Sequence, residues 1–236
     1  MKLYSELADW WPLLTPPGTY TEEAQVLNAL LRQGNRDLRH IIEFGSGGGH
    51  LAADFPKDLQ ITLVDNSPEM LEVSRQINPE KEHILGDMRD LHSNRQYDAV
   101  LVHDAVMYLQ TREDIFSMLS TAYRQLTPGG CILLVPDYIK ESFAENSISG
   151  GAADERRAIQ LMEWAWDPIP DDEKYQVEFS ILTRQNNTIQ SFHETHYMGL
   201  FDISTWVNLL NKSGFTLVVP EIEYWFGGEI FLARKT

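Results

Sequence analysis

The chain has 236 residues, enough for one α/β domain with an inserted subdomain, and its single cysteine, Cys131, excludes an internal disulfide framework. A formal net charge of −16 opposes approach to nucleic acid phosphates or to an anionic membrane surface. The apolar runs have strand length, and the first residues lack a basic start followed by an apolar stretch, so we expect a cytoplasmic protein without membrane span or signal peptide.

Residues 2–20 are rich in aromatic side chains and are interrupted by prolines and a glycine. Tyr4–Trp11 could form a short helix, and the whole segment is expected either to pack on the core or to cover a ligand as a lid. Thr21 is predicted to cap a helix whose apolar stripe includes Val26, Leu27, Leu30 and Leu31 and which ends near Gly34.

A glycine-rich stretch follows the first predicted strand. Ile41–Phe44 has the composition of a short buried strand, and the segment Gly-Ser-Gly-Gly-Gly at residues 45–49 lets the backbone turn sharply and approach a ligand. A dinucleotide-binding G-x-G-x-x-G fingerprint would need its third glycine where His50 stands. Glu43, near the strand end, would repel a phosphate and attract an ammonium or a sulfonium. The stretch is therefore either a turn for a cationic cofactor or a ligand-free surface loop.

The second predicted strand, Ile61–Val64, ends in an acid. Asp65 lies about twenty residues beyond the first glycine, where a doubly wound fold places a carboxylate against ribose hydroxyls. Asp65 could instead cap the helix that starts after Pro68, although Asn66 or Ser67 could provide that cap and leave Asp65 for the ribose.

The remaining elements continue the alternation of strands and helices up to residue 136. A third strand, His83–Leu85, ends in Gly86-Asp87, and a central strand, Tyr97–Val102, is followed by His103 at the edge where open α/β sheets bind ligands. The helix Arg112–Leu126 and the turn through Gly130 lead to the strand Cys131–Pro136.

The pattern changes after Asp137. Residues 155–166 are predicted to be helical, and Tyr175–Thr183 and Thr188–Tyr197 alternate like two strands of an antiparallel hairpin. A helix over Phe201–Ser213 and strands at Phe215–Val219 and Glu229–Arg234 complete the chain.

Four features of the chain resemble, in their order and spacing, the motifs of class I S-adenosylmethionine-dependent methyltransferases. They are the stretch from Glu43 through its glycines, Asp65, Gly86-Asp87, and the Leu-x-Pro-Gly-Gly turn at 126–130. The resemblance covers roughly residues 40–136. It implies an enzyme with a doubly wound Rossmann-like sheet, mostly parallel with one antiparallel edge, plus an inserted antiparallel β-hairpin. We expect one domain over residues 1–236, with an N-terminal aromatic lid at 1–20 and an inserted substrate or dimer subdomain at 138–200.

The resemblance also implies which residues bind S-adenosyl-L-methionine. The expected cofactor-binding residues are Glu43, Gly45, Gly47, Gly49, Asp65, Asn66, Met70, Gly86, Asp87, Met88 and His103. The first candidates for a base or an orienting group beside the methyl are His103, Tyr20 and His196. His193 is a further candidate base, and Tyr4 is a further candidate orienting group. His103 could also form a local hydrogen bond and take no part in chemistry. No metal is expected.

The C-terminal part resembles, more loosely, enzymes that N,N-dimethylate amino sugars. We therefore expect a small-molecule acceptor, an amine rather than a hydroxyl, no nucleic acid or membrane partner, and a homodimer contact through the hairpin at 175–197. The alternatives are a non-catalytic protein that binds S-adenosylmethionine or acts as a scaffold, and a nicotinamide-dependent oxidoreductase, against which Glu43 and His50 argue.

Overall fold

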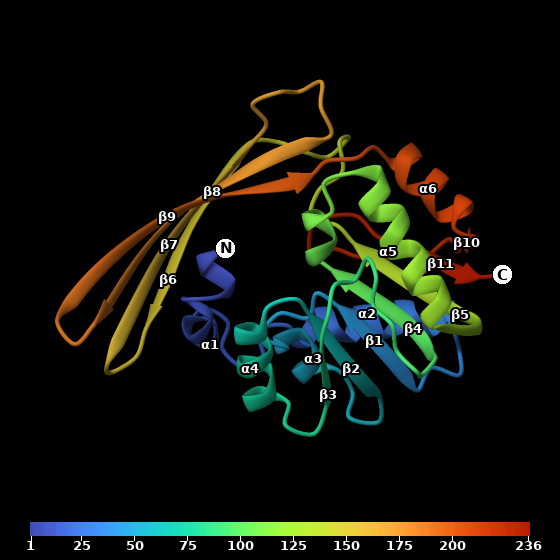
Figure 1. The fold of residues 1–236 in the computed structure, drawn as a ribbon, viewed down its shortest axis with the longest axis horizontal. Helices are drawn as coiled ribbons and strands as arrows, with labels where there is room; N and C mark the ends of the chain where they lie inside the picture. The colour runs from blue at the N-terminus through green and yellow to red at the C-terminus, as the bar shows by residue number, and fades with distance from the viewer.

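The computed structural model describes residues 1–236 and contains two sheets. Figure 1 shows the second sheet projecting to the left of the first, with the N-terminal segment between them. The first sheet has seven strands in the order β10-β11-β5-β4-β1-β2-β3, and the second has four strands in the order β6-β7-β8-β9. The strands of the first sheet are β1 (His40–Phe44), β2 (Gln60–Asp65), β3 (Glu82–Leu85), β4 (Tyr97–His103), β5 (Leu126–Val135), β10 (Phe215–Leu217) and β11 (Phe231–Lys235).

Helices cover both faces of the seven-stranded sheet. Its central strands are apolar on both sides: Ile42 and Val100 pack toward one face, while Ile41 and Leu101 pack toward the other. The first of these faces carries α5 (Arg112–Gln125) and α6 (Ile203–Lys212), and the second carries α2 (Thr21–Gly34) and α3 (His50–Asp54). The helix α4 (Pro68–Ile77) contacts β2, β3 and the N-terminal segment.

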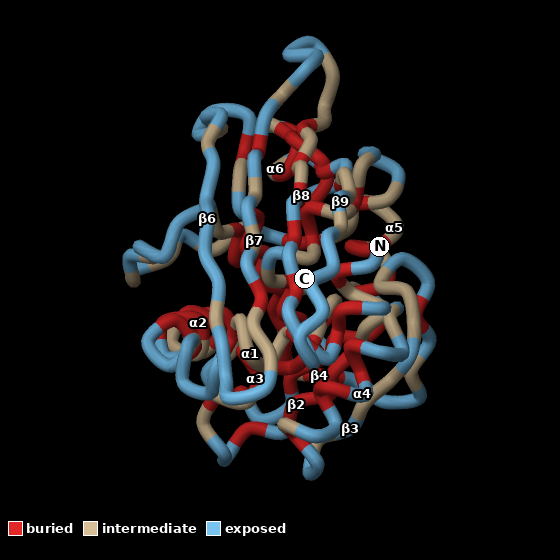
Figure 2. The backbone as a smooth tube through the Cα atoms, turned by 90° about the vertical axis from the view of Figure 1, so that its left-hand side faces the viewer, coloured by how far each residue is buried: buried red, intermediate tan, exposed pale blue.

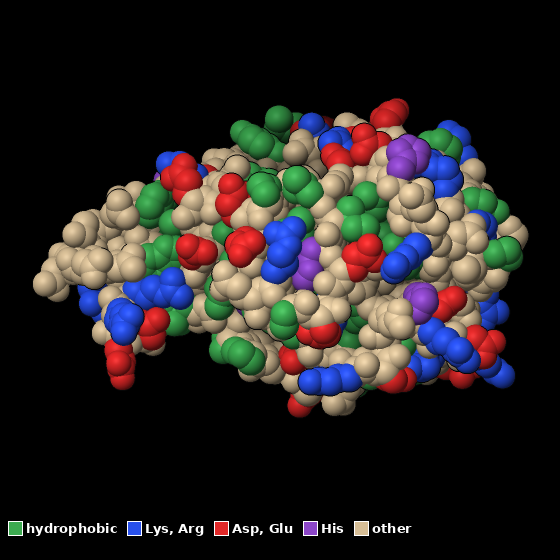
Figure 3. Space-filling model, turned by 60° about the horizontal axis from the view of Figure 1, so that its bottom comes forward, with side chains coloured by type: hydrophobic (Ala, Val, Ile, Leu, Met, Phe, Trp, Pro, Cys, Tyr) green, Lys and Arg blue, Asp and Glu red, His purple; other side chains and the backbone are tan.

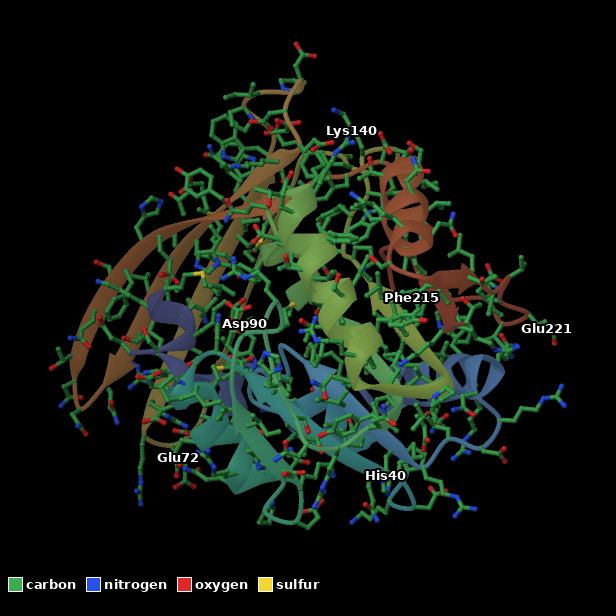
Figure 4. The ribbon with its side chains drawn as sticks, turned by 45° about the vertical axis from the view of Figure 1, so that its right-hand side comes forward. His40, Glu72, Asp90, Lys140, Phe215 and Glu221 are labelled. Carbon is green, nitrogen blue, oxygen red and sulfur yellow. The ribbon has the colours of Figure 1, made fainter.

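The predicted fold class is confirmed. Five of the strands pair in parallel, and β11 runs antiparallel to its neighbours β5 and β10 at one side of the sheet. His40, which begins β1, lies on the side of the molecule away from the second sheet (Figure 4). The parallel strands therefore run toward the second sheet, and their carboxyl ends face it.

The predicted hairpin is half of the four-stranded antiparallel sheet, which consists of β6 (Asn146–Ala153), β7 (Arg157–Trp166), β8 (Lys174–Gln185) and β9 (Thr188–Gly199). Asn186 and Asn187, both with positive φ, form the two-residue turn between β8 and β9. Figure 2 shows that the edge strand β6 is exposed along most of its length.

The helix predicted over residues 155–166 is wrong, because this segment is strand β7. Ile159 and Ala165 are buried on the inner face, whereas Trp164 and Trp166 are exposed on the outer face. Apolar residues on both faces fit a helical stripe as well as a strand, so periodicity alone did not separate the two.

Two expectations about helix starts have different outcomes. Thr21 does not cap α2: it is the first helical residue, and its hydroxyl donates to the carbonyl of Gly18 (3.1 Å). Ser67 does cap α4, because its hydroxyl accepts from the backbone N–H of Met70 (3.1 Å). The N-terminal segment forms two 3₁₀ turns, η1 (Lys2–Tyr4) and η2 (Ala8–Trp10), followed by α1 (Trp11–Leu14). No helix has the length and apolar character needed to span a membrane.

Candidate cofactor and acceptor site

A cavity of about 830 Å³ opens at the carboxyl ends of the parallel strands. The N-terminal segment, the glycine loop, the ends of β2, β3 and β4, and strand β9 line it. Most residues predicted for the site lie in this lining, namely Tyr20, Glu43, Gly45, Gly47, Asp65, Asn66, Met70, Gly86, Asp87, Met88, His103 and His196. The cavity brings these residues together, and Gly49 is the one predicted cofactor residue outside the lining.

The glycine loop is shaped by two close approaches. Gly45 has a φ of 71°, and a Cβ there would lie 2.2 Å from the Cβ of Ala105, so a side chain is excluded. Gly49 also has positive φ, but a Cβ there would meet the hydroxyl of Ser74 at 2.3 Å. Its carbonyl accepts from the amide of Asn78 (2.8 Å). Gly49 therefore lets α3 and α4 pack closely and does not face the cavity.

Glu43 brings a buried carboxylate to the cavity. Its side chain is almost inaccessible, and Oε2 has no hydrogen-bond partner. Burial raises the pKa of Glu43 to about 7. An acceptor without a donor in a buried site fits a ligand that brings an ammonium group, as the methionyl part of S-adenosylmethionine does.

Asp65 is held rigidly at the end of β2. Its carboxylate accepts from the backbone N–H of Gly47 (2.7 Å) and of Ser67 (2.8 Å). Burial raises the pKa of Asp65, and these backbone hydrogen bonds oppose that shift. Each carboxylate oxygen keeps a lone pair after one hydrogen bond, so the side chain can still accept from ribose hydroxyls.

Asp87, the predicted adenine partner, is bound by an arginine. The Arg89 guanidinium contacts Asp87 (2.6 Å) and Asp114 (2.8 Å), and its hydrogen bond lowers the pKa of Asp87. The carboxylate of Asp87 is therefore ionised and oriented at the edge of the cavity.

His103 lies between two carboxylates. Its Nε2 lies 2.8 Å from Glu23 Oε1, and its Nδ1 lies 3.3 Å from Asp104 Oδ2. The hydroxyl of Tyr224 also donates to Glu23. Burial alone would lower the pKa of His103, but the charges of Asp104 and Glu23 outweigh it and raise the pKa to about 9. The imidazole is thus a cation at neutral pH, with Tyr20 edge-on at 6.2 Å between ring centres.

His196 lines the cavity from strand β9 and is linked to two tyrosine hydroxyls. Its Nδ1 is 2.8 Å from the hydroxyl of Tyr108, which donates to the hydroxyl of Tyr4 (2.9 Å). Its Nε2 lies 3.1 Å from Glu194 without hydrogen-bond geometry, and burial lowers the pKa of His196. The structure does not bring His193 to the site, because it points away from the cavity on the outer face of β9 and pairs with Glu178 (2.9 Å).

Sequence reasoning missed the pair Asp104 and Asp137. Asp104 directly follows β4 with a φ of 47°, and Asp137 lies just after β5. Desolvation and the nearby charge of Asp104 raise the pKa of Asp137 well above its usual range. Asp104 lines the cavity, whereas Asp137 is exposed and lies outside the lining. The rule that ligands bind at the carboxyl edge of the sheet was the signal that could have indicated both residues.

Comparisons with known proteins agree with this geometry. Residues 41–130 match the family model described as a methyltransferase domain. The dTDP-3-amino-3,4,6-trideoxy-alpha-D-glucopyranose N,N-dimethyltransferase of Streptomyces venezuelae is 24% identical over 89% of this chain and 86% of that protein.

Two solved structures show the same fold. The structure of Streptomyces venezuelae DesVI is 22% identical, with a TM-score of 0.82 over 96% of this chain and 97% of that chain. The S-adenosylmethionine-bound structure of CalS10, an amino pentose methyltransferase from Micromonospora echinaspora, is 21% identical, with a TM-score of 0.78 over 92% of both chains. The chain therefore carries a methyltransferase domain at residues 41–130 and has the fold of these S-adenosylmethionine-dependent methyltransferases.

Proposed function

We propose that this enzyme transfers a methyl group to the amine nitrogen of a small molecule. The observation that carries the choice of nitrogen over oxygen is the position of His103 between the side chains of Glu23 and Asp104. A hydroxyl acceptor usually needs a base beside it, whereas an amine needs only to lose its proton before attack. His103 holds a proton between Glu23 and Asp104 at neutral pH, so it is not available as that base.

The acid-rich surroundings of the cavity support the same choice. The carboxylates of Glu23 and Asp104 lie beside His103 and favour a ligand that arrives as an ammonium. The names of the Streptomyces venezuelae relative and of the Micromonospora structure both concern amino sugars. An amine on a sugar-like small molecule is therefore the acceptor that we propose.

The residues of the chain have separate proposed roles. Bound S-adenosylmethionine supplies an electrophilic methyl group on a sulfonium. Glu43 holds the methionyl ammonium, Asp65 holds the ribose, and Asp87 with Met88 faces the adenine. Tyr4 and Tyr20 in the N-terminal segment exclude water from the reacting atoms, which favours an in-line displacement.

The test is a methylation assay with a panel of small primary amines and their hydroxyl analogues. We expect methylated amine, detected by mass spectrometry, and S-adenosylhomocysteine in equal amounts. Turnover of the hydroxyl analogues in preference to the amines would contradict the proposal. Tight cofactor binding without turnover of any panel member would favour the non-catalytic alternative, and binding of NAD in place of S-adenosylmethionine would favour the oxidoreductase.

The proposed partners follow from charge and exposure. Figure 3 shows Lys and Arg interspersed with Asp and Glu on the face in view, without a continuous basic patch for nucleic acid. The homodimer through the hairpin at 175–197 stays a prediction, since Leu182 and Tyr197 expose apolar surface on β8 and β9. Light scattering after gel filtration would measure the oligomeric state.

A further inference from the structure

Tyr4 lies in the wall of the cavity, and its backbone is held from two sides. The preceding N–H groups, those of Lys2 and Leu3, donate to the carboxylate of Glu194 on β9 (2.6 and 2.8 Å). The carbonyl of Tyr4 itself accepts from the hydroxyl of Ser67 at the start of α4. The position of this residue is therefore fixed by the second sheet and by the region around the cofactor loop together.

The ring of Tyr4 is fixed by other rings that also line the cavity. Its centre lies 5.5 Å from that of Trp11, 5.9 Å from that of Tyr108 and 5.8 Å from that of His196. Tyr108 meets it almost perpendicularly, at 83°, which is a favourable arrangement for two aromatic rings. The hydroxyl of Tyr4 consequently has one defined position in the wall.

The hydrogen bonds between these side chains run in one direction, toward Tyr4. The hydroxyl of Tyr108 donates to that of Tyr4 (2.9 Å). A phenol has a single hydrogen, so the 2.8 Å contact between Tyr108 and Nδ1 of His196 requires the imidazole to be the donor. The hydrogen of the Tyr4 hydroxyl is then left over, and no group of the protein accepts it. The chain therefore ends in a donor that is available to a molecule in the cavity.

His196 begins this chain and is held rigidly. Its side chain is fully buried, and the ring of Phe179 packs on it with 4.6 Å between ring centres. Its Nε2 has no hydrogen-bond partner, although Glu194 Oε1 lies 3.1 Å away. The hydrogen bond of Nδ1 is thus the one that this imidazole makes, and it determines the direction of the whole chain.

The nitrogen of an amine acceptor does not match the free hydrogen of Tyr4. An ammonium nitrogen has no lone pair to accept a hydrogen bond. A deprotonated amine needs its lone pair for the methyl carbon, and a donor aimed at that lone pair would oppose the attack. Burial raises the pKa of Tyr4 well above its usual range, so the hydroxyl keeps its hydrogen at neutral pH. The matching partner is therefore an oxygen of the ligand.

The charges of the cavity limit which kind of oxygen this is. Its one arginine, Arg89, is already bound by two carboxylates. The lining also contains five acidic residues, Glu43, Asp65, Glu69, Asp87 and Asp104. A carboxylate oxygen on the acceptor would be repelled by this excess of negative charge, whereas a hydroxyl or ether oxygen would not.

The hydroxyl of Tyr4 also lies among residues other than those assigned to the cofactor. Its hydrogen-bond chain belongs to η3 (Ala105–Tyr108) and to β9. The proposed cofactor residues Glu43, Asp65 and Asp87 lie instead at or just after the ends of β1, β2 and β3. The free donor is therefore placed on the side of the cavity that the second sheet forms.

From these contacts we propose that the hydroxyl of Tyr4 donates to a neutral oxygen, a hydroxyl or an ether, of the acceptor amine. We assign to His196 the part of a positioning residue, which acts through Tyr108 and keeps the hydrogen of Tyr4 free for the acceptor. The inference rests on the proposed function and adds a specificity determinant to it. The acceptor is then an oxygen-bearing amine and not a simple alkyl amine.

The first experiment removes the oxygen from the ligand and the hydroxyl from the enzyme in turn. Methylation rates are measured with cyclohexylamine, with the isomeric aminocyclohexanols and with their methyl ethers. We expect kcat/KM of the wild type to be about tenfold higher for the best oxygen-bearing amine than for cyclohexylamine. Tyr4→Phe should abolish this preference, because phenylalanine keeps the ring without the hydroxyl. Unchanged affinity for S-adenosylhomocysteine shows that the variant is folded.

Tyr123→Phe is the matched control. It also removes a phenolic donor, but one that bonds to the backbone carbonyl of Thr236 away from the cavity, so its kinetics should equal those of the wild type. A wild type without the preference, or a preference that persists in Tyr4→Phe, would overturn the inference and leave the proposed function standing. An equal loss for every amine, with weaker binding of S-adenosylhomocysteine, would overturn it by assigning the hydroxyl to the cofactor. Failure of the wild type to methylate any amine, amino sugars included, would overturn the proposed function as well.

The second experiment tests the positioning role of His196 with two polar variants. The amide of asparagine lies near the place of Nδ1 and can donate to Tyr108, whereas that of glutamine lies near the place of Nε2 and cannot. His196→Asn should keep most of the preference for the oxygen-bearing amine, and His196→Gln should reduce it about threefold or more while the rate with cyclohexylamine stays unchanged. Equal preferences in the two variants, or an equal loss for all amines, would overturn the positioning role.

Discussion

At the residue scale, the proposed role of Glu43 should couple cofactor binding to pH. Burial raises its pKa to about 7 in the folded protein, and an ammonium ligand binds its ionised form. Affinity for S-adenosylmethionine should therefore increase about tenfold from pH 6 to pH 8, with proton release on binding at the lower pH. Calorimetry in buffers of different ionisation enthalpy measures both effects. In Glu43→Gln the affinity should be weaker and its pH dependence absent, and a persisting dependence would assign it to another group.

The buried carboxyl group of Glu43 should also lower the stability of the cofactor-free protein. Because the folded pKa of Glu43 lies above its ordinary value of 4.5, the ionisation of Glu43 lowers the free energy of unfolding as the pH rises from about 4.5 to about 7. Glu43→Gln should consequently raise the melting temperature of the cofactor-free protein at pH 8 while it weakens cofactor binding. A lower melting temperature at this pH would contradict the inference that the ionised side chain is destabilising.

His103 should contribute to stability in the opposite pH direction. Its pKa is raised from 6.5 to about 9, so its stabilisation is complete below about pH 6.5 and is lost as the pH rises through about 9. His103→Gln should lower the free energy of unfolding at pH 6 by on the order of 3 kcal/mol, because Glu23 and Asp104 lose their buried cation. Denaturant titrations at pH 6 and pH 10 measure the difference, which should shrink at pH 10.

The matched control for His103 is His193→Gln. His193 also pairs with a glutamate, Glu178, but its side chain is 68% exposed. Exposed pairs contribute about 0–1 kcal/mol, so this variant should have nearly wild-type stability. Equal losses in the two variants would show that burial does not distinguish the two pairs.

At the scale of elements, strand β9 holds the N-terminal segment over the cavity. Glu194 accepts from the backbone N–H groups of Lys2 (2.6 Å) and Leu3 (2.8 Å). The hydroxyl of Ser67, at the start of α4, donates to the carbonyl of Tyr4. The segment thus connects the second sheet to the cofactor loop and covers both parts of the site.

Glu194→Gln should loosen this cover without unfolding the protein. A neutral amide accepts these two hydrogen bonds more weakly than a carboxylate, and charge-assisted bonds contribute about 1.5–3 kcal/mol. We expect faster hydrogen exchange in residues 1–15, faster release of S-adenosylhomocysteine and an almost unchanged melting temperature. Glu178→Gln, on the outer face of the neighbouring strand, should change none of these. Unchanged exchange in Glu194→Gln would show that other contacts hold the segment.

The elements that the sequence predicted correctly are those with one dominant pattern. Buried parallel strands such as Tyr97–His103 are apolar on both faces and follow turn residues, which the sequence displays directly. Strand β7 also carries apolar residues on both faces. Because it is ten residues long and has tryptophans on its outer face, its sequence fits the apolar stripe of a helix as well. Pairing with β6 and β8 decides its conformation, and such long-range pairing is not local information.

The residues of the candidate site also differ in how far the sequence could predict them. The glycine loop and Asp65 are local motifs with fixed spacing, so the sequence predicted where they lie. The pair of Asp104 and Asp137, and the contact of Glu23 with His103, join residues more than thirty positions apart. Only the parallel arrangement of β4 and β5 brings the two aspartates together, and only the packing of α2 brings Glu23 to β4.

At the scale of the whole molecule, repulsion between negative charges should determine how the melting temperature responds to salt. The net charge of −16 is far from neutral at pH 7, and few of the acids are balanced by nearby Lys or Arg. Self-repulsion destabilises the compact state and is screened as the Debye length falls from about 30 Å at 0.01 M salt to a few ångströms near 1 M. The melting temperature at pH 8 should therefore rise by a few degrees when sodium chloride is added.

The control is the same titration near the isoelectric point. At pH 5, close to the sequence pI of about 4.7, the net charge is small, so added salt should change the melting temperature much less. Scanning calorimetry at both pH values, with and without about 0.5 M sodium chloride, measures the contrast. If salt stabilised the protein equally at both pH values, general salting-out of apolar surface would explain the effect instead of charge screening. If salt lowered the melting temperature at pH 8, the ion pairs, such as Arg89 with Asp87 and Asp114, would outweigh the excess negative charge.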